Sequence, residues 1–204
     1  MLEREVDCRG MACPKPVMMA RKALDEIAQG RVRVLVTQEV QSRNLEQLAQ
    51  ASGCEVEILT REGHYEVVIS KPSGADPSQP ASEYAPQPAA ETPGTVALLL
   101  TSDQIGQGDP KLGALLTQLM LTTLAEAEPT PTYVLLMNAG VRLACSGSAA
   151  VEALAKLEER QVQVLVCGTC LQFLGLLDDQ KVGKISNMYD IVSILTAAQR
   201  VVAL

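Results

Sequence analysis

The chain has 204 residues, of which 47% are hydrophobic and 20% are charged, and its formal net charge is −7. These values are typical of a globular protein of one or two domains and exclude a disordered chain. Aromatic residues make up only 2%, and no basic cluster offsets the acidic balance, so we expect no binding of nucleic acid. No apolar run reaches membrane-spanning length, and the first residues lack the apolar core of a signal peptide. We therefore expect a cytoplasmic protein that does not bind membranes.

The first 70 residues predict a domain with the element order βαβαββ, a two-layer α/β sandwich. The expected elements are a strand ending at Asp7, a helix from Cys13 to about Gln29, a strand over 31–37, a helix over about 41–52 that stops at Gly53, and strands 54–60 and 65–70 joined by a hairpin turn. The only histidine, His64, is assigned to that turn. A hydrolase of the Cys–His or Ser–His–Asp type is therefore not expected.

The start of the first helix carries the strongest chemical signal. Pro14 is expected at the first helical position, because its φ is already helical and its missing N–H has no partner there. Cys13 then lies at or near the N-cap, where the free N–H of Lys15 and the positive end of the helix dipole favour an anion. A thiolate is the anion available. The alternative is a buried structural cysteine that happens to precede a helix.

A spaced motif around Cys13 resembles the signature of the TusA/SirA-like sulfur-carrier domain. The motif consists of Asp7, Gly10, Cys13, Pro14 and Pro16. The resemblance covers about residues 3–70 and implies that Cys13 accepts sulfur as a persulfide and hands it on. It also implies that the two prolines fix the start of the helix, with Lys15 between them, while Asp7 and Gly10 shape the preceding loop.

Residues 71–94 hold six of the eleven prolines and otherwise mostly small or polar residues, so we interpret them as a linker. The rest of the chain, residues 95–204, predicts a second domain. Its expected strands are 95–101, 133–138, 162–167, 182–185 and 200–204, and its expected helices are near 111–126, near 148–160, after Cys170 and over about 188–199. Repeated βα units with continuous apolar strands indicate a three-layer α/β/α domain with a five-stranded, mostly parallel sheet.

The motif Cys167-Gly168-Thr169-Cys170 directly follows the third strand of this second domain, at the edge where open α/β sheets bind ligands. Together with the segments 102–109, 138–141 and 186–191, it resembles the DsrE-like sulfur-transfer family. The combination with a TusA-like domain is similar to the YedF group, which is linked with selenium metabolism. The resemblance implies that Cys167 takes the transferred sulfur or selenium and that Cys170 is a resolving or second acceptor thiol.

Other interpretations of these cysteines remain open. A CxxC motif can form a dithiol redox site or half of a zinc knuckle, although the chain has only one such motif. Cys145 is expected at the same sheet edge as Cys167, as a relay thiol or a buried bystander, and Asn187 is a supporting residue of the motif. In a cytoplasmic chain, six cysteines favour reactive roles over a disulfide framework.

The sequence therefore predicts a carrier of cysteine persulfide or selenopersulfide, which accepts the chalcogen on Cys13 and relays it to Cys167 or to a partner. Such a protein would be sulfurtransferase-like and would need no cofactor or metal. The implied partners are a cysteine desulfurase or another donor, a downstream acceptor, and further copies of the chain bound through the second domain. The alternatives are a redox sensor or oxidoreductase built on the CxxC motif, and a non-catalytic oligomeric adaptor.

Overall fold

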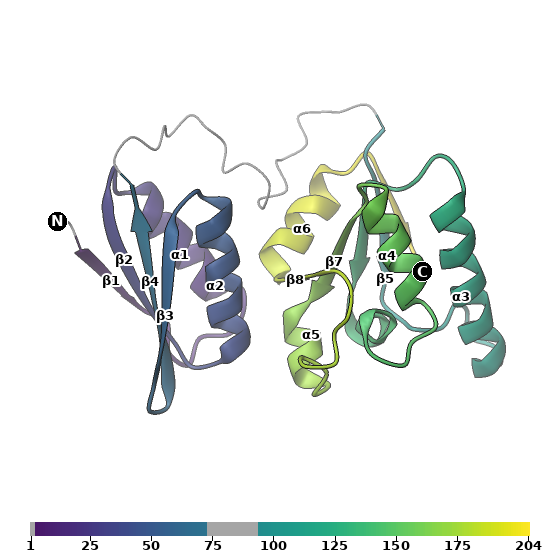
Figure 1. Ribbon diagram of the computed structural model, residues 1–204, viewed down its shortest axis with the longest axis horizontal. Helices are drawn as coiled ribbons and strands as arrows, with labels where there is room; N and C mark the ends of the chain where they lie inside the picture. Colours follow the sequence, from purple (N-terminus) through teal and green to yellow (C-terminus); the bar gives the residue numbers. More distant parts are fainter. Residues whose placement is uncertain (1–2, 73–93) are drawn as a thin grey trace. The chain divides into compact units, whose positions relative to one another are not determined.

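The computed structural model describes residues 3–72 and 94–204 (Figure 1). The chain divides into two compact units, one built on strands β1–β4 and the other on strands β5–β9. The predicted linker, residues 71–94, lies almost entirely outside the described residues. None of the helices in the described part of the chain is long and apolar enough to cross a membrane.

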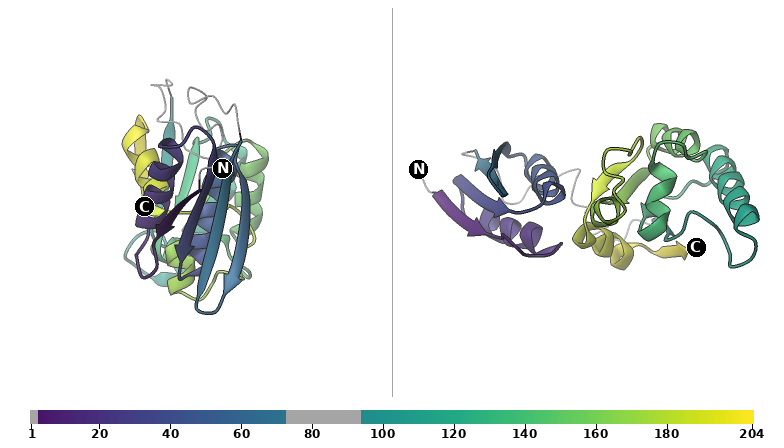
Figure 2. Two further views of the ribbon diagram at one scale, coloured as in Figure 1. Left: turned by 90° about the vertical axis from the view of Figure 1, so that its left-hand side faces the viewer. Right: turned by 90° about the horizontal axis from the view of Figure 1, so that it is seen from below.

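The first unit is a four-stranded sheet with both of its helices on one face (Figures 1 and 2). Its elements are β1 (Glu3–Asp7), α1 (Lys15–Asp25), β2 (Gly30–Val36), α2 (Glu39–Ala51), β3 (Glu55–Arg61) and β4 (His64–Lys71). β1 and β2 are parallel, and β4 pairs antiparallel with β2 and β3, which gives the strand order β1-β2-β4-β3. The predicted two-layer βαβαββ sandwich is confirmed.

The core of this unit follows from the alternation of small β-branched residues in β2. Val32, Val34 and Val36 are fully buried, because every second side chain of β2 faces the helices. Leu24 of α1 and Leu45 of α2 belong to the same apolar cluster. The unit thus buries one face of its sheet under two amphipathic helices.

Two details of this unit differ from the prediction. α1 ends at Asp25, before the expected Gln29, because the Glu26 N–H closes the last turn on Lys22 and the chain must then turn into β2. The hairpin turn contains only Glu62 and Gly63, whose φ of +78° suits a two-residue turn. His64 is therefore the first residue of β4 and not a turn residue.

The second unit alternates strands and helices. Its elements are β5 (Val96–Leu100), α3 (Pro110–Glu126), β6 (Tyr133–Leu136), the 3-10 helix η1 (Asn138–Ala144), α4 (Val151–Glu159), β7 (Gln163–Cys167), α5 (Gly168–Phe173), β8 (Lys184–Ser186), α6 (Met188–Ala197) and β9 (Arg200–Ala203). All five strands are parallel, in the order β8-β7-β6-β5-β9. The predicted five-stranded sheet is confirmed, and within the described residues it is parallel throughout.

Helices cover both faces of this sheet. The steps from β5 to β6 and from β6 to β7 run in one direction, so right-handed crossovers place α3 and α4 on the same face. The connection from β8 to β9 returns across the whole sheet, and α6 therefore lies on the opposite face (Figures 1 and 2). This is the expected three-layer α/β/α arrangement, and it buries the central strand β6 along its whole length.

A close backbone approach fixes η1 against the end of β5. A Cβ atom added to Gly140 would lie 2.2 Å from the Leu100 carbonyl oxygen, so no larger residue fits at this position. The Gly140 N–H also donates to the Met137 carbonyl at 2.9 Å. The segment that follows β6 is therefore held firmly at the carboxyl edge of the sheet.

Candidate functional site

Cys13 lies in the turn before α1 and is half-buried. Pro14 is the N-cap residue, with φ −99° and ψ 11°, and its peptide bond to Cys13 is cis. The prediction that Pro14 is the first helical residue is therefore wrong by one position, because its backbone has not yet reached helical geometry. Pro16 falls in the first helical turn, where its missing N–H breaks no helix bond.

The sequence suggested that the Lys15 N–H is free, but the structure shows that it is hydrogen-bonded. It donates to the Ala12 carbonyl at 3.1 Å and closes the turn that contains Cys13. The structure therefore gives Cys13 a fixed place in a turn and partial access to solvent, while the Lys15 donor is already used.

The loop before Cys13 is held by contacts from both ends. Asp7 forms an ion pair with Arg9 at 2.7 Å and also accepts the Arg9 backbone N–H at 3.1 Å. The hydrogen bonds from Arg9 lower the pKa of the Asp7 carboxyl to about 2. Gly10 has φ +73° and donates its N–H to Thr37 Oγ1 at 2.9 Å. Asp7 and Gly10 thus both make contacts that order this loop.

The buried side chain of Gln41 also anchors this loop, and the sequence did not reveal it. Gln41 Nε2 donates to the Met11 carbonyl at 2.7 Å, and Gln41 Oε1 accepts the Gln38 N–H at 3.2 Å. One amide therefore ties the Cys13 loop to the start of α2. The sequence signal was a glutamine at the third position of a helix, as in a capping box, but the residue before that helix is not the usual serine or threonine.

The two other cysteines of this unit are buried in its core. Cys8 is fully buried and Cys54 nearly so, and burial raises the pKa of both thiols. Cys8 lies beside Met19, with 3.9 Å between the two sulfur atoms. Cys13 is therefore the one partly exposed thiol among the described residues of the first unit.

In the second unit, Cys167 is the last residue of β7 and the N-cap of α5. The helix expected after Cys170 begins earlier, at Gly168, so the CxxC motif opens the helix and does not precede it. The cause is local: Cys167 has the extended backbone of a strand end, and the chain turns into the helix at the following glycine.

The environment of Cys167 opposes ionisation. Only 1% of the residue is exposed, and burial raises the pKa of its thiol to about 12. A hydrogen bond with the side chain of Cys170 acts in the same direction, while the N–H groups of Cys170 and Thr169 oppose the rise. The thiol that the family resemblance singled out is therefore neutral and shielded in the folded chain.

Cys170 lies in a different environment. It is only partly buried, and its Sγ accepts the backbone N–H of Asn138 at 3.1 Å. Asn138 is the first residue of η1 and has φ +48°. An N–H donor at a sulfur atom stabilises negative charge on that sulfur. The carboxyl edge of the sheet thus brings together Asn138, Cys167 and Cys170.

Cys145 and Asn187 lie near the same edge and are both buried. Cys145 is buried, its Sγ donates to the Val141 carbonyl at 3.3 Å, and burial raises the pKa of its thiol. Asn187 is 2% exposed and directly follows β8, whose Ser186 pairs with Cys167. A structural role in holding the edge fits both residues, and neither presents a thiol or an amide to solvent.

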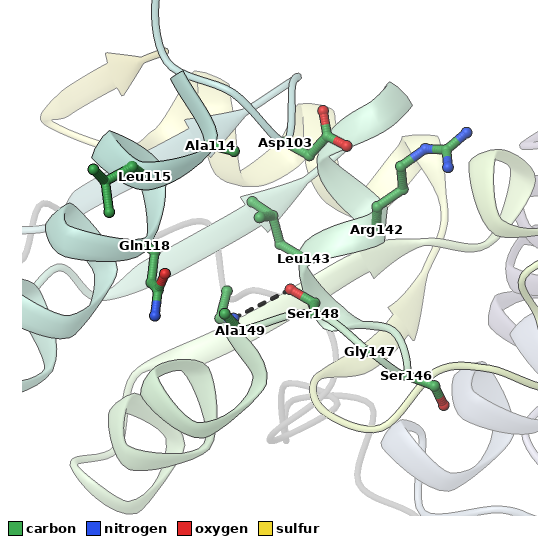
Figure 3. Close-up of a pocket in the computed structure, with 11 residues that line it drawn as sticks. Asp103, Ala114, Leu115, Gln118, Arg142, Leu143, Ser146, Gly147, Ser148 and Ala149 are labelled. Carbon is green, nitrogen blue, oxygen red and sulfur yellow. Dashed lines mark hydrogen bonds between the residues drawn. The ribbon is translucent and has the colours of Figure 1, made fainter. Parts of the chain in front are cut away.

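A pocket of about 480 Å³ lies on the α3–α4 side of the second unit (Figure 3). Ala114, Leu115 and Gln118 of α3 line one side of it, and Leu143 and Ser148 line the other. No cysteine is among the described residues that line this pocket, so it is separate from the CxxC motif. Within the described residues there is also no cluster of three side chains suited to hold a metal ion.

The two thiols of the CxxC motif should react very differently with iodoacetamide. At pH 8, a thiol with a pKa of about 12 is ionised in roughly one molecule in ten thousand. We expect the folded chain to be alkylated at Cys170 well before Cys167, as read from labelled peptides by mass spectrometry. The denatured chain is the control, in which both residues should react at similar rates. Equal labelling in the folded chain would contradict this description of Cys167.

Comparisons with known proteins agree with the two-unit organisation. The family model described as sulfurtransferase TusA matches residues 4–71, and the DsrE/DsrF-like family model matches residues 100–204. No curated protein matches the chain.

Two solved structures are similar to parts of the chain. A SirA-like protein from Desulfitobacterium hafniense is 38% identical over 34% of this chain and 96% of its own, with a TM-score of 0.32. The ychN protein from E. coli is 17% identical over 54% of this chain and 98% of its own, with a TM-score of 0.39. The DsrE/DsrF-like match spans just over half of the chain and coincides with the parallel sheet that carries the CxxC motif. This chain accordingly belongs to the DsrE/DsrF-like family, with a TusA-type domain fused in front of the family domain.

Proposed function

We propose that this protein carries sulfane sulfur, which it accepts on Cys13 as a persulfide and relays to the Cys167–Cys170 motif or to a partner protein. The two family matches support a role in sulfur trafficking. The observation that carries the finer proposal is the distribution of exposure among the six free cysteines, all of which lie in the described residues. Cys13 and Cys170 are partly exposed, whereas the other four are buried.

The transfer to Cys13 is a thiol–persulfide exchange. The Cys13 thiolate attacks the terminal sulfur of a donor persulfide, the donor's S–S bond breaks, and the donor leaves as a thiolate. Atoms and charge balance without an external oxidant or reductant. A cysteine desulfurase is a donor of the required chemistry, and selenium in place of the terminal sulfur follows the same course. Free thiols persist in reducing compartments, so we place the relay in the cytoplasm.

The loop around Cys13 suits this role because its position does not depend on the thiol. Gly10 is bonded to Thr37 and the Met11 carbonyl to Gln41, while Lys15 closes the turn on Ala12. None of these bonds uses the Cys13 sulfur. An added sulfur atom on Cys13 therefore requires no rearrangement of the loop bonds.

A thiol–disulfide oxidoreductase or redox sensor is a second candidate function. It is favoured by the position of the CxxC motif at the opening of α5, where the side chain of Cys170 lies close enough to Cys167 to help raise the pKa of its thiol. That arrangement allows a disulfide between the first and fourth residues of the motif.

A third role, assembly through the second unit, is favoured by an apolar face on α3. Leu112, Leu115, Leu116 and Leu119 recur at helical spacing, and each is between 42% and 53% exposed. Exposed apolar stripes of this kind mark interaction surfaces. Leu115 also lines the pocket beside α3, so the exposed leucine face and the pocket are adjacent on one surface. We propose that this face binds further copies of the chain.

Replacing Cys13 with serine should abolish sulfur uptake from a cysteine desulfurase supplied with cysteine. The reason is that the serine hydroxyl cannot form a persulfide, while the loop bonds stay in place. The measurement is the added mass on each cysteine-containing peptide. Cys54→Ser is the matched control, since it removes a buried thiol from the same unit. If Cys13→Ser took up as much sulfur as the original chain, Cys13 would not be the acceptor.

Equilibration with glutathione redox buffers should separate the carrier from the redox sensor. A sensor requires the Cys167–Cys170 pair to form a disulfide reversibly at a potential in the cytosolic range. For a carrier we expect the reduced pair to predominate in the absence of sulfane sulfur. The fraction of disulfide is read by differential alkylation. A pair that is mostly oxidised under cytosolic conditions would favour the sensor.

Leu119→Glu should lower the oligomeric state, because a carboxylate cannot be buried in an apolar contact without a large desolvation cost. The molar mass is measured by size-exclusion chromatography with light scattering. Val192→Glu is the control, since Val192 is also an exposed apolar residue, 47% exposed, but lies on α6. If the original chain were a monomer, or if both variants behaved alike, the leucine face of α3 would not be the contact.

A further inference from the structure

The two cysteines of the CxxC motif have opposite access to solvent. Cys167 is 1% exposed at the end of β7, whereas Cys170 is partly exposed in the first turn of α5. A sulfane sulfur delivered by another protein or domain must first meet a sulfur atom that it can reach. In this structure that atom is the Cys170 sulfur.

Asn138 provides a hydrogen-bond donor to the Cys170 sulfur. Its backbone N–H points at Cys170 Sγ with an N···S distance of 3.1 Å. The Asn138 N–H is held in place, because the close approach of Gly140 to the Leu100 carbonyl fixes η1. A fixed N–H donor therefore contacts the sulfur atom at which the new S–S bond forms.

Cys167 is shielded from solvent but lies three residues before Cys170, at the start of the same helix. It is buried at the end of β7, and the side chain of Cys170 lies close enough to contribute to the raised pKa of its thiol. The other buried thiol of this unit, Cys145, donates to the Val141 carbonyl and is not bonded to the motif. Cys167 is therefore placed to react with Cys170 and shielded from reactants in solution.

We propose that Cys170 is the acceptor of sulfane sulfur in the second unit and that Cys167 then releases the sulfur as hydrogen sulfide by forming a disulfide with Cys170. This inference rests on the proposed carrier function, because sulfane sulfur has to be delivered to the second unit. It reverses the order suggested by the family resemblance, in which Cys167 is the acceptor. It also gives the CxxC motif an activity beyond carriage, namely reductive release of the chalcogen.

The two steps balance. First, the Cys170 thiolate attacks the terminal sulfur of a persulfide, which forms Cys170–S–SH and frees the donor thiolate. Second, the Cys167 sulfur attacks the inner sulfur of Cys170–S–SH, forms the Cys167–Cys170 disulfide and expels hydrosulfide, which takes the proton of the Cys167 thiol and leaves as H₂S. The sulfane sulfur is reduced by two electrons and the dithiol is oxidised by two. A dithiol reductant then restores the motif.

The burial of Cys167 accounts for the sequence of events. Burial holds the pKa of its thiol at about 12, so it is a poor nucleophile towards sulfur species in solution. The attack of Cys167 on the Cys170 persulfide is intramolecular, and the departing hydrosulfide accepts the proton of the Cys167 thiol. The same burial that argues against Cys167 as the acceptor thus suits it for the second step.

The experiment uses the full chain carrying Cys13→Ser as the parent, so that the first unit does not supply sulfur. The reduced parent is treated with inorganic polysulfide, freed of small molecules, alkylated and mapped by mass spectrometry. We expect a Cys167–Cys170 disulfide and no retained sulfur on either residue. Adding Cys167→Ala should leave one extra sulfur atom on Cys170. Adding Cys170→Ser should abolish both the disulfide and any sulfur on Cys167. Adding Cys54→Ser is the control and should change nothing.

Several results would overturn the inference. Sulfur found on Cys167 in the Cys170→Ser chain would make the buried thiol the acceptor. A stable persulfide on the parent motif, without disulfide, would exclude release. If Cys167→Ala fails to fold, early time points of the parent replace it, and they should show sulfur on Cys170 before the disulfide appears.

The outcome is separable from that of the carrier proposal. Polysulfide reaches Cys170 without Cys13, so failure here leaves the desulfurase experiment on Cys13 untouched. Conversely, Cys13 could fail to accept sulfur while the motif still converted polysulfide sulfur to sulfide.

Discussion

Parallel, in-register pairing of β6, β7 and β8 is the constraint on which the second unit's chemistry depends. Because the strands run in the same direction, their carboxyl ends meet at one edge. Leu136 pairs with Val166 and Cys167 pairs with Ser186, so the segment after β6 starts beside the end of β7. That is why Asn138 reaches a sulfur atom 32 residues later in the sequence. Antiparallel pairing would have sent the two segments to opposite edges.

The same edge holds two thiols, Cys167 and Cys170, that lie within one turn of helix but differ in exposure. The end of β7 is covered on both faces, so the strand's last side chain is desolvated and stays neutral. Three residues later the helix has carried Cys170 away from the strand, towards solvent and the Asn138 N–H. The first unit separates its thiols in a comparable way, since Cys8 is sealed beneath α1 whereas Cys13 lies in the turn before it. In both units the position of a cysteine relative to the end of a strand decides its access.

The sequence predicted the fold well because its signals are local and repeated. Alternation in residues 31–37 and the continuous apolar runs before Asn138 and at Cys167 each identify a strand, and Gly53 marks the end of α2 with a φ of +63°. The details of the two thiol sites depend on contacts between distant residues. Thr37 holds Gly10 across 27 positions, and Gln41 holds the Met11 carbonyl across 30. Local sequence patterns cannot predict hydrogen bonds between residues so far apart in the chain.

The differences between the sequence prediction and the structure at the site have the same origin. Proline preference alone put Pro14 inside the helix, but the bond from the Lys15 N–H to Ala12 inserts a turn before it. A family resemblance singles out Cys167 by its place after a strand, and the burial of that place becomes visible only when the neighbouring strands are assembled. Motifs therefore predicted which cysteines are candidates for the reaction. The three-dimensional structure was needed to show that Cys13 and Cys170 are partly exposed whereas Cys167 is buried.

Shielding of the resolving thiol has a consequence for specificity. If Cys167 were as exposed as Cys170, any small disulfide or polysulfide in solution could react with either sulfur. With Cys167 enclosed, oxidation of the pair requires that Cys170 first becomes a persulfide or a mixed disulfide. The buried strand end thus leaves the first contact with any reactant to Cys170, because Cys167 can act only on what Cys170 has bound.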